Sequence, residues 1–299
     1  MEFQAGIHHK RGYLHKDFAL FHIKDRKQIE FDFHYHDFNK IIIFLSGKVV
    51  YHIEGKAYTL KPWDILLVNH HEIHKPMIDT SEEYERVAIW INWDFVNKHN
   101  GADANLLHCF QKAASQKFNL LRLSPEGVST IRQILFSLEE ACKDQEFGSQ
   151  VLQNSLFLQL LVLLNRAFLG IETPGLHQDI ECDAAIEDIL EYINGNLGEE
   201  LSVDQLASLF YTSKYYLMRK FKKQTGYTLH NYIQQKRLIA ANGLIKEGKP
   251  LSFVCAECGF GDYSNFVRAF KKMFGLSPKQ HYKLLVQQQK DEASSQSHL

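Results

Sequence analysis

Two segments near the C-terminal end of the sequence each place one arginine three residues before a pair of lysines. The first holds Arg219 and Lys222-Lys223, and the second holds Arg268 and Lys271-Lys272. A guanidinium can donate two parallel hydrogen bonds to the edge of a guanine, and a lysine ammonium binds backbone phosphate. These residue types at this spacing have the chemistry needed to bind a nucleic acid.

Three histidines in the first hundred residues could do a different chemistry. His34 and His36 lie two positions apart, so on a strand both side chains point to one face, and His74 follows later in the chain. Three imidazoles could hold zinc, iron or manganese. The cation Lys40 opposes metal binding, so we expect no metal here. The imidazoles, with Trp63, are instead expected to line the pocket of an organic effector or to pack in the core.

The basic residues lie in a segment of unusual charge. Residues 213–283 contain 14 Lys or Arg and 3 Asp or Glu, whereas the whole chain has a net charge of −1. A basic segment in a nearly neutral protein favours a polyanionic partner, most often nucleic acid. A solvated basic face is the alternative, and the pattern of residues within the segment decides between the two.

That pattern is an internal repeat of a short helix, a tight turn and a longer helix. Aligning Phe221 with Phe270 also superposes three further pairs: Leu217 with Phe266, Arg219 with Arg268, and Gly226 with Gly275. In the first copy, Ser202 and Gln205 form a capping box, Ser213 caps the longer helix and Gly226 ends it. Gly259, Asp262 and Gly275 supply the turn, cap and stop of the second copy. The repeat predicts two helix-turn-helix motifs.

The longer helices are amphipathic in a way that suits DNA recognition, because one face is apolar and the other carries mixed polar chemistry with few acidic residues. Side chains expected to face the bases are Lys214, Tyr215, Met218 and Arg219 in the first copy and Tyr263, Ser264, Val267 and Arg268 in the second. Side chains expected to bind phosphate are Lys222, Lys223, Lys271 and Lys272. Residues 229–246 read as one connecting helix, which would hold the two longer helices about one DNA turn, ~34 Å, apart.

The front of the chain has a different periodicity. Short apolar runs at 41–45, 49–53, 65–68 and 86–92, separated by turn residues, predict an all-β domain, closed or sandwich-like. Residues 102–170 then change to helical spacing. A helix over 151–163 is apolar around most of its girth, which indicates burial on several sides, either inside its own domain or in a homodimer seam.

Composition limits the class of protein. With 45% hydrophobic and 23% charged residues, the sequence is typical of a globular protein. Its longest apolar stretch, 156–164, is far shorter than the ~20 residues of a membrane span, so no membrane is expected. Five cysteines without regular spacing favour reduced thiols and a cytoplasmic location, and Cys255 and Cys258 are expected to be small core residues. Without a Gly-rich phosphate loop or a Gly-x-Ser-x-Gly element, we expect no enzyme, no catalytic residue and no cofactor.

The C-terminal hundred residues resemble a known family. The segment from Lys236 to Phe260, followed by Asp262, Phe266, Arg268, Phe270-Lys271-Lys272, Gly275 and Ser277-Pro278, resembles the signature of the AraC family of bacterial transcription regulators. The front of the chain is similar to that family's sensor domain, a cupin barrel followed by dimerisation helices. The chain departs from the family at Tyr211, where the first turn often has Gly, and at Cys255 and Cys258, where Ala and Val are common. It departs from enzymatic cupins at Lys40, where they carry Glu.

The resemblance, together with the turn residues near 173–175 and the polar composition after residue 287, predicts an α+β chain in five parts: a cupin-like sensor barrel (1–100), a helical dimerisation segment (101–172), a linker (173–184), a double helix-turn-helix domain (185–286) and a disordered tail (287–299). It also implies a homodimeric regulator, more often an activator, that binds promoter DNA and RNA polymerase and responds to a small-molecule effector, with a sugar as one candidate. Two alternatives stay open at this point: a metal-dependent cupin enzyme with an appended helical domain, and a protein whose basic helices bind an acidic partner.

Overall fold

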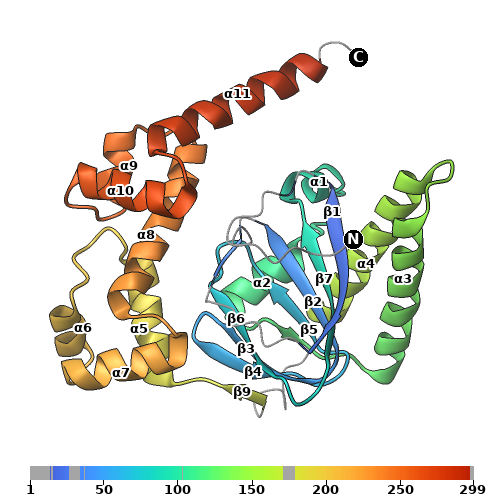
Figure 1. Cartoon of the computed structure of the whole chain (residues 1–299), viewed down its shortest axis with the longest axis horizontal. Helices are drawn as coiled ribbons and strands as arrows, with labels where there is room; N and C mark the ends of the chain where they lie inside the picture. The colour runs from blue at the N-terminus through green and yellow to red at the C-terminus, as the bar shows by residue number, and fades with distance from the viewer. Residues whose placement is uncertain are drawn as a thin grey trace. The chain divides into compact units, whose positions relative to one another are not determined.

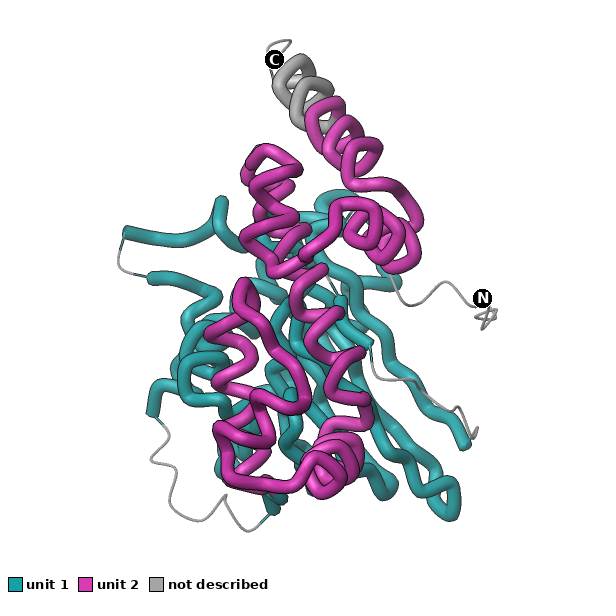
Figure 2. The backbone as a smooth tube through the Cα atoms, turned by 90° about the vertical axis from the view of Figure 1, so that its left-hand side faces the viewer, with its two compact units in different colours: residues 1–181 teal, residues 182–299 magenta. Residues whose placement is uncertain are grey.

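The computed structural model describes Leu14 and residues 16–26, 34–36, 38–102, 104–170 and 179–296, with side chains as far as residue 287. The chain forms two compact units, Met1–Glu181 and Cys182–Leu299 (Figure 2). The border between them falls inside the range expected to be a linker, of which residues 173–178 lie outside the described part.

Unit 1 is built on two antiparallel β-sheets (Figure 1). The five-stranded sheet has the order β1-β7-β2-β5-β8 and the four-stranded sheet the order β6-β3-β4-β9. The strands are β1 (Phe18–Asp25), β2 (Asn39–Ser46), β3 (Lys48–Ile53), β4 (Lys56–Thr59), β5 (Ile65–Val68), β6 (His74–Asp79), β7 (Tyr84–Ile91), β8 (Leu120–Leu121) and β9 (Ile180–Glu181).

Strand β2 shows why its sequence is an unbroken apolar run. Successive side chains on a strand point to opposite faces. Ile41 and Ile43 pack in the cluster on the helical side of the sheet, whereas Ile42 and Phe44 pack in the cluster between the two sheets. Because both faces are covered, neither set of positions can be polar without a partner.

The α+β fold class predicted from the sequence is confirmed. The two sheets face each other across a shared apolar cluster, and among the described residues they remain separate hydrogen-bonded ladders, so the cupin-like barrel is open rather than closed. An isolated bridge between His34 and His74 continues the pairing beyond the named strands.

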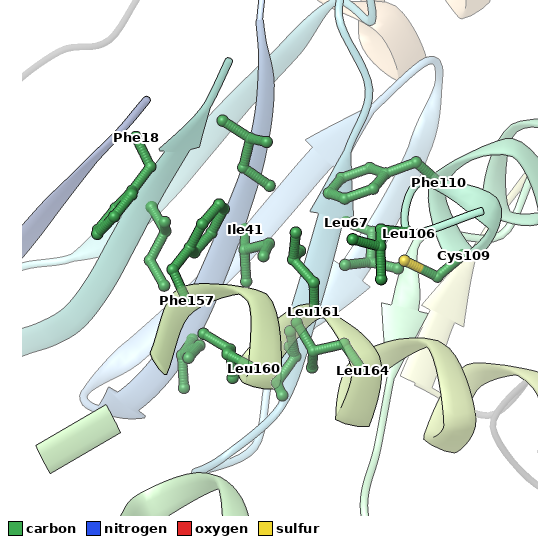
Figure 3. Packing of buried hydrophobic residues seen from close by; sticks show 14 of the residues in the cluster. Phe18, Ile41, Leu67, Leu106, Cys109, Phe110, Phe157, Leu160, Leu161 and Leu164 are labelled. Atoms are coloured by element: carbon green, nitrogen blue, oxygen red, sulfur yellow. The ribbon is translucent and has the colours of Figure 1, made fainter. Parts of the chain in front are cut away.

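Four helices accompany the sheets of unit 1: α1 (Trp93–Lys98), α2 (His108–Gln116), α3 (Pro125–Lys143) and α4 (Ser149–Leu169). Figure 3 shows α4 side chains pointing into a cluster with residues of the five-stranded sheet and of α2. Within this cluster the rings of Phe18 and Phe157 stack with centroids 4.4 Å apart. The helix is long and apolar enough to cross a membrane by length and composition alone; its buried face, which includes Leu160, Leu161 and Leu164, explains that composition through core packing.

A buried charge network fixes the end of unit 1. The guanidinium of Arg122 donates two hydrogen bonds to the carboxylate of Asp64, at 2.7 and 2.6 Å, and a third to Asp179 at 2.6 Å. Asp179 immediately precedes β9, which pairs with β4. Bidentate pairing of this kind satisfies the carboxylate of Asp64, which is 1% exposed.

Unit 2 is helical throughout its described length. It contains α5 (Ala184–Gly195), α6 (Val203–Leu209), α7 (Lys214–Thr225), α8 (Leu229–Lys246), α9 (Leu251–Glu257), α10 (Tyr263–Phe274) and α11 (Pro278–Gln296). The connecting helix predicted over 229–246 is confirmed by α8. Helix α11 continues to Gln296, through much of the segment where the sequence suggested a disordered tail; Gln, Lys, Glu and Ala in that segment are all compatible with a helix.

Candidate nucleic-acid interface and effector site

The first helix-turn-helix motif consists of α6 and α7 and has the predicted caps. The side chain of Ser202 accepts from the backbone N–H of Gln205, and the Gln205 side chain accepts from the backbone N–H of Ser202, which completes the capping box. Ser213 caps α7, and Gly226 ends it with a φ of +75°. Both ends of the longer helix therefore lie at the residues that the sequence predicts.

The second motif consists of α9 and α10 and follows the same plan. The carboxylate of Asp262 accepts from the backbone N–H of Asn265 at 2.7 Å and so caps α10. Gly275 ends the helix with a φ of +82°, and Gly259 adopts +70° in the turn. Cys255 and Cys258 are buried in the apolar cluster of this motif, as predicted.

The turns of the two motifs differ at the position where the sequence departs from the family pattern. Tyr211, which stands where the family often has glycine, adopts a φ of +49° with its side chain 98% exposed. A left-handed conformation is costly for a residue with a Cβ atom. The first turn therefore keeps the motif geometry at the expense of local strain.

An arginine that the sequence analysis did not single out as a site residue joins the motifs. Arg237 on α8 donates to the carbonyl oxygens of Leu197 at 2.9 Å, Gly259 at 2.8 Å and Glu199 at 2.5 Å. Leu197 and Glu199 lie in the segment leading to α6, and Gly259 lies in the second turn. One side chain on the connecting helix thus holds parts of both motifs together.

The two longer helices bury one face and expose the other. Leu217 and Phe221 of α7, and Phe266 and Phe270 of α10, are at most 1% exposed. Among the twelve side chains predicted to contact DNA, all are exposed except Val267, which is half-buried. The structure therefore leaves the predicted base-facing and phosphate-facing side chains on the surface of unit 2.

Several of these polar side chains already have partners on the surface. Lys214 forms an ion pair with Asp204 of α6, and the guanidinium of Arg268 donates to the side chain of Asn265 at 2.5 Å. Lys220, which the sequence analysis left out, pairs with Asp183 at 2.6 Å. Exposed pairs of this kind contribute little stability, so they can exchange for contacts with an anion.

The three histidines predicted in unit 1 do come together. Nitrogen atoms of His34, His36 and His74 lie within 4.8 Å of one another. The ammonium Nζ of Lys40 lies 3.1 Å from Nε2 of His36 and 3.4 Å from Nε2 of His74. A metal ion would need the Nε2 lone pairs of His36 and His74, which already accept from the Lys40 ammonium. The residues present therefore do not fit a metal ion.

Burial controls the charge of this cluster. Lys40 is 8% exposed and His74 is 1% exposed. Burial, together with the nearby charge of Arg86, lowers the pKa of Lys40 to about 7. Burial first, and then the charge of Lys40, holds the pKa of His74 well below its usual value, so this imidazole is neutral.

Aromatic rings adjoin the histidines, but not all of those expected. The ring of Phe38 stacks on His36 and on Trp90, with centroids 4.7 Å apart in both cases. Trp63 does not join this cluster: it packs against the apolar cluster on the helical side of the sheet, under the guanidinium of Arg132 on α3, 4.6 Å from the ring centroid. The i, i+2 spacing of residues 34, 36, 38 and 40 is the sequence signal that could have grouped Phe38 and Lys40 with the imidazoles.

Comparison with known proteins supports both parts of this description. A family model of the AraC-like ligand binding domain matches residues 18–161, and one of a helix-turn-helix domain matches residues 206–283. The HTH-type transcriptional activator RhaS of Enterobacter sp. (strain 638) is 26% identical over 258 residues, which is 85% of this chain and 88% of that protein. RhaS of Citrobacter koseri is 25% identical over 253 residues, 84% of this chain and 87% of that protein. A solved structure of an apo ToxT variant from Vibrio cholerae is 17% identical and covers 90% of this chain and 98% of its own, with a TM-score of 0.37.

A ligand-binding unit of two sheets and a helical unit with paired helix-turn-helix motifs define a DNA-binding transcription regulator that is controlled by an effector, and not an enzyme. The chain belongs to the AraC family of transcription regulators.

Proposed function

We propose that the protein activates transcription by placing α7 and α10 in successive major-groove segments of promoter DNA. The observation that supports this most directly is the repeated exposure of one arginine on each helix, Arg219 and Arg268, opposite a buried, mainly apolar face. The base-facing side chains are Lys214, Tyr215, Met218 and Arg219 on α7, and Tyr263, Ser264, Val267 and Arg268 on α10. Lys222, Lys223, Lys271 and Lys272, in the last turns of the two helices, bind phosphate.

The dimer proposed from the sequence uses the outer face of α3 and α4. Phe136 is 65% exposed, Val151 70% and Leu152 49%, and these apolar side chains lie on the two helices that cover the sheet. Two copies joined there would present four reading helices, in keeping with the two-fold symmetry common among DNA-binding proteins. These exposed apolar residues support the proposal that residues 101–172 form the dimerisation segment.

The effector binds in unit 1 beside His34, His36 and His74. Trp90 and Phe38 replace Trp63 as the aromatic side chains of this site, and a sugar-like molecule suits such a wall because its apolar faces pack on rings. The protein acts in the bacterial cytoplasm, where it meets promoter DNA and RNA polymerase; the relatives named above are bacterial activators.

Duplex binding at a series of salt concentrations tests this function. The purified protein first selects a preferred duplex from a pool of random sequences. The affinity of the protein for this selected duplex is then measured by fluorescence anisotropy. The logarithm of affinity should fall linearly with the logarithm of salt concentration, and Lys271→Ala should reduce that slope by about 1 while weakening all duplexes alike. Affinity that does not depend on salt, or random duplex that competes as well as the selected one, would contradict sequence-specific DNA binding.

A further inference from the structure

When it is protonated, Lys40 is a buried cation with no counter-ion among the described residues. Its side chain lies between the two sheets, it is 8% exposed, and among the described residues no carboxylate pairs with it. Its ammonium lies within hydrogen-bond distance of the imidazoles of His36 and His74. Burying a charge without an opposite charge is costly, which makes this position unfavourable in the ligand-free protein.

The tautomer of His74 determines which group donates in the hydrogen bond between His74 and Lys40. Nδ1 of His74 lies 2.9 Å from the carbonyl oxygen of Glu72, so Nδ1 carries the hydrogen and donates it. Nε2 therefore holds a lone pair and accepts from Lys40. An ammonium has three hydrogens, and the two imidazoles account for two of them. No described residue accepts the third, which is available to a ligand.

The surroundings of this donor indicate the shape of its partner. The pairing of β2 with β7 places Lys40 opposite Trp90, and the ring of Trp90 also contacts Phe21, with centroids 4.7 Å apart. Further along β7, the hydroxyl of Tyr84 is buried without a partner, and the guanidinium of Arg86 lies 4.2 Å from the Tyr84 ring centroid. Arg86 has its own counter-charge, because its guanidinium pairs with the carboxylate of Asp25 at 3.4 Å, whereas Lys40 pairs with no carboxylate among the described residues.

We propose that the effector is a small organic anion whose carboxylate accepts the third N–H of Lys40, while its body packs on Trp90 and Phe38. The carboxylate supplies a counter-charge that no described residue provides, whereas a neutral sugar of the same shape would leave the ammonium uncompensated. This proposal rests on the proposed function in placing the effector site in unit 1, and it narrows the effector to acids such as sugar acids.

Two substitutions of Lys40 test the ligand-free state. Lys40→Met removes the charge but keeps the length, and Lys40→Gln keeps a donor for one imidazole without the charge. If the charge is reserved for a ligand, the Lys40→Met protein should melt at a higher temperature than the wild type without ligand. Lys98→Met, on the exposed end of α1, is the control and should leave the melting temperature unchanged. Lower melting temperatures for both Lys40 variants would make Lys40 a structural donor and overturn the proposal.

Matched acids and neutral compounds test the ligand class. Thermal shift and titration calorimetry on the full chain would compare D-galacturonate with D-galactose, D-glucuronate with D-glucose, and benzoate with benzyl alcohol, with inorganic phosphate as a bare anion. At least one carboxylate should bind ten-fold or more tightly than its neutral counterpart, and both Lys40 variants should lose ten-fold or more of that affinity while Lys98→Met keeps it. A neutral compound that binds as tightly as its acid, an acid whose binding survives Lys40→Gln, or a set in which only phosphate binds would overturn it.

Duplex binding separates this proposal from the proposed function. The Lys40 variants, without any acid, should bind the selected duplex as the wild type does, because Lys40 lies in unit 1 and the reading helices lie in unit 2. If wild-type protein binds the acid but no duplex, the proposed function fails and the ligand class stands; if it binds duplex but prefers neutral compounds, the ligand class fails alone.

Discussion

Two long cationic side chains, Arg237 and Lys40, differ in the groups that accept their hydrogen bonds. Arg237 donates to three backbone carbonyls, and each of those acceptors would otherwise need water. Lys40 donates to two neutral imidazoles and meets no carboxylate among the described residues. The first arrangement satisfies the guanidinium with backbone acceptors, whereas the second leaves the ammonium without a negative partner among the described residues, which is the basis of the proposed anion site.

The lowered pKa of Lys40, about 7, makes stability depend on pH. Between about pH 7 and 10 the unfolded chain binds a proton that the folded chain does not, so stability rises with pH over this window. The groups that face Lys40 are His36, His74 and Arg86. The lowered pKa of His74 acts with the same sign, but only below its ordinary value of 6.5.

We therefore expect the free energy of unfolding of the wild type, measured relative to Lys40→Met, to increase by about 2–5 kcal/mol from pH 7 to pH 10. Urea unfolding of both proteins at four pH values measures this difference, and groups common to the two proteins cancel. A difference that stays constant across the range would show that the ammonium is not buried as described.

At the scale of elements, the turns of the two motifs use equivalent left-handed positions with different residues. Gly259 meets close neighbours: a Cβ atom there would overlap the carbonyl oxygen of Leu197 and lie 2.8 Å from the Arg237 guanidinium. Tyr211 points into solvent. The second turn therefore depends on glycine for space as well as for conformation, and the first does not.

Gly259→Ala should lower the free energy of unfolding by at least about 2 kcal/mol, because it adds overlap to the cost of a left-handed alanine. Tyr211→Gly should change it by less than about 1 kcal/mol, since relief of strain and the greater freedom of the unfolded chain offset each other. Denaturant unfolding of the full chain compares them. Equal effects of the two substitutions would mean that Arg237 does not hold the second turn.

Elements with a local signal were predictable, and those that depend on distant partners were not. Caps at Ser202, Ser213 and Asp262 and the connecting helix α8 follow from short patterns, and the structure confirms them. Strands β1, β4 and β6 were missed because they have mixed polarity or are short, and β6 contains a proline. Their pairing depends on neighbours far along the chain.

The candidate sites likewise include residues that a local pattern predicts and residues that depend on distant partners. The reading helices could be predicted because helical spacing alone sorts exposed from buried positions. Trp63 was expected to line the pocket with the histidines, yet it packs on the helical side of the sheet. The contact between Lys40 and His74 joins residues 34 positions apart, and the contacts of Arg237 join residues 22 to 40 positions apart; no local periodicity carries that information.

For the whole molecule, the apolar outer face of α3 and α4 is the surface on which the proposed dimer depends. Leu152→Glu would place a charge on that face without touching the buried face that packs on the sheet. We expect it to convert the dimer to a monomer at micromolar concentrations, as measured by analytical ultracentrifugation, and to weaken duplex binding through loss of avidity.

The matched control is Phe253→Glu, which changes a similarly exposed apolar residue, 47% against 49%, in unit 2. It should leave the sedimentation coefficient of the dimer unchanged. A Leu152→Glu protein that stays dimeric, or a wild type that is monomeric at these concentrations, would contradict the proposal that α4 forms the dimer interface.

The affinities of Arg219→Ala and Arg268→Ala for the selected duplex, and for every single-base variant of it, decide whether α7 and α10 read DNA bases. Each substitution should cost about 1–3 kcal/mol on the selected duplex and abolish discrimination at its own base pair, with the two base pairs about one helical turn apart. Two arginine variants that weaken all duplexes equally, as Lys271→Ala is expected to do, would contradict the claim that each helix reads bases through its single arginine.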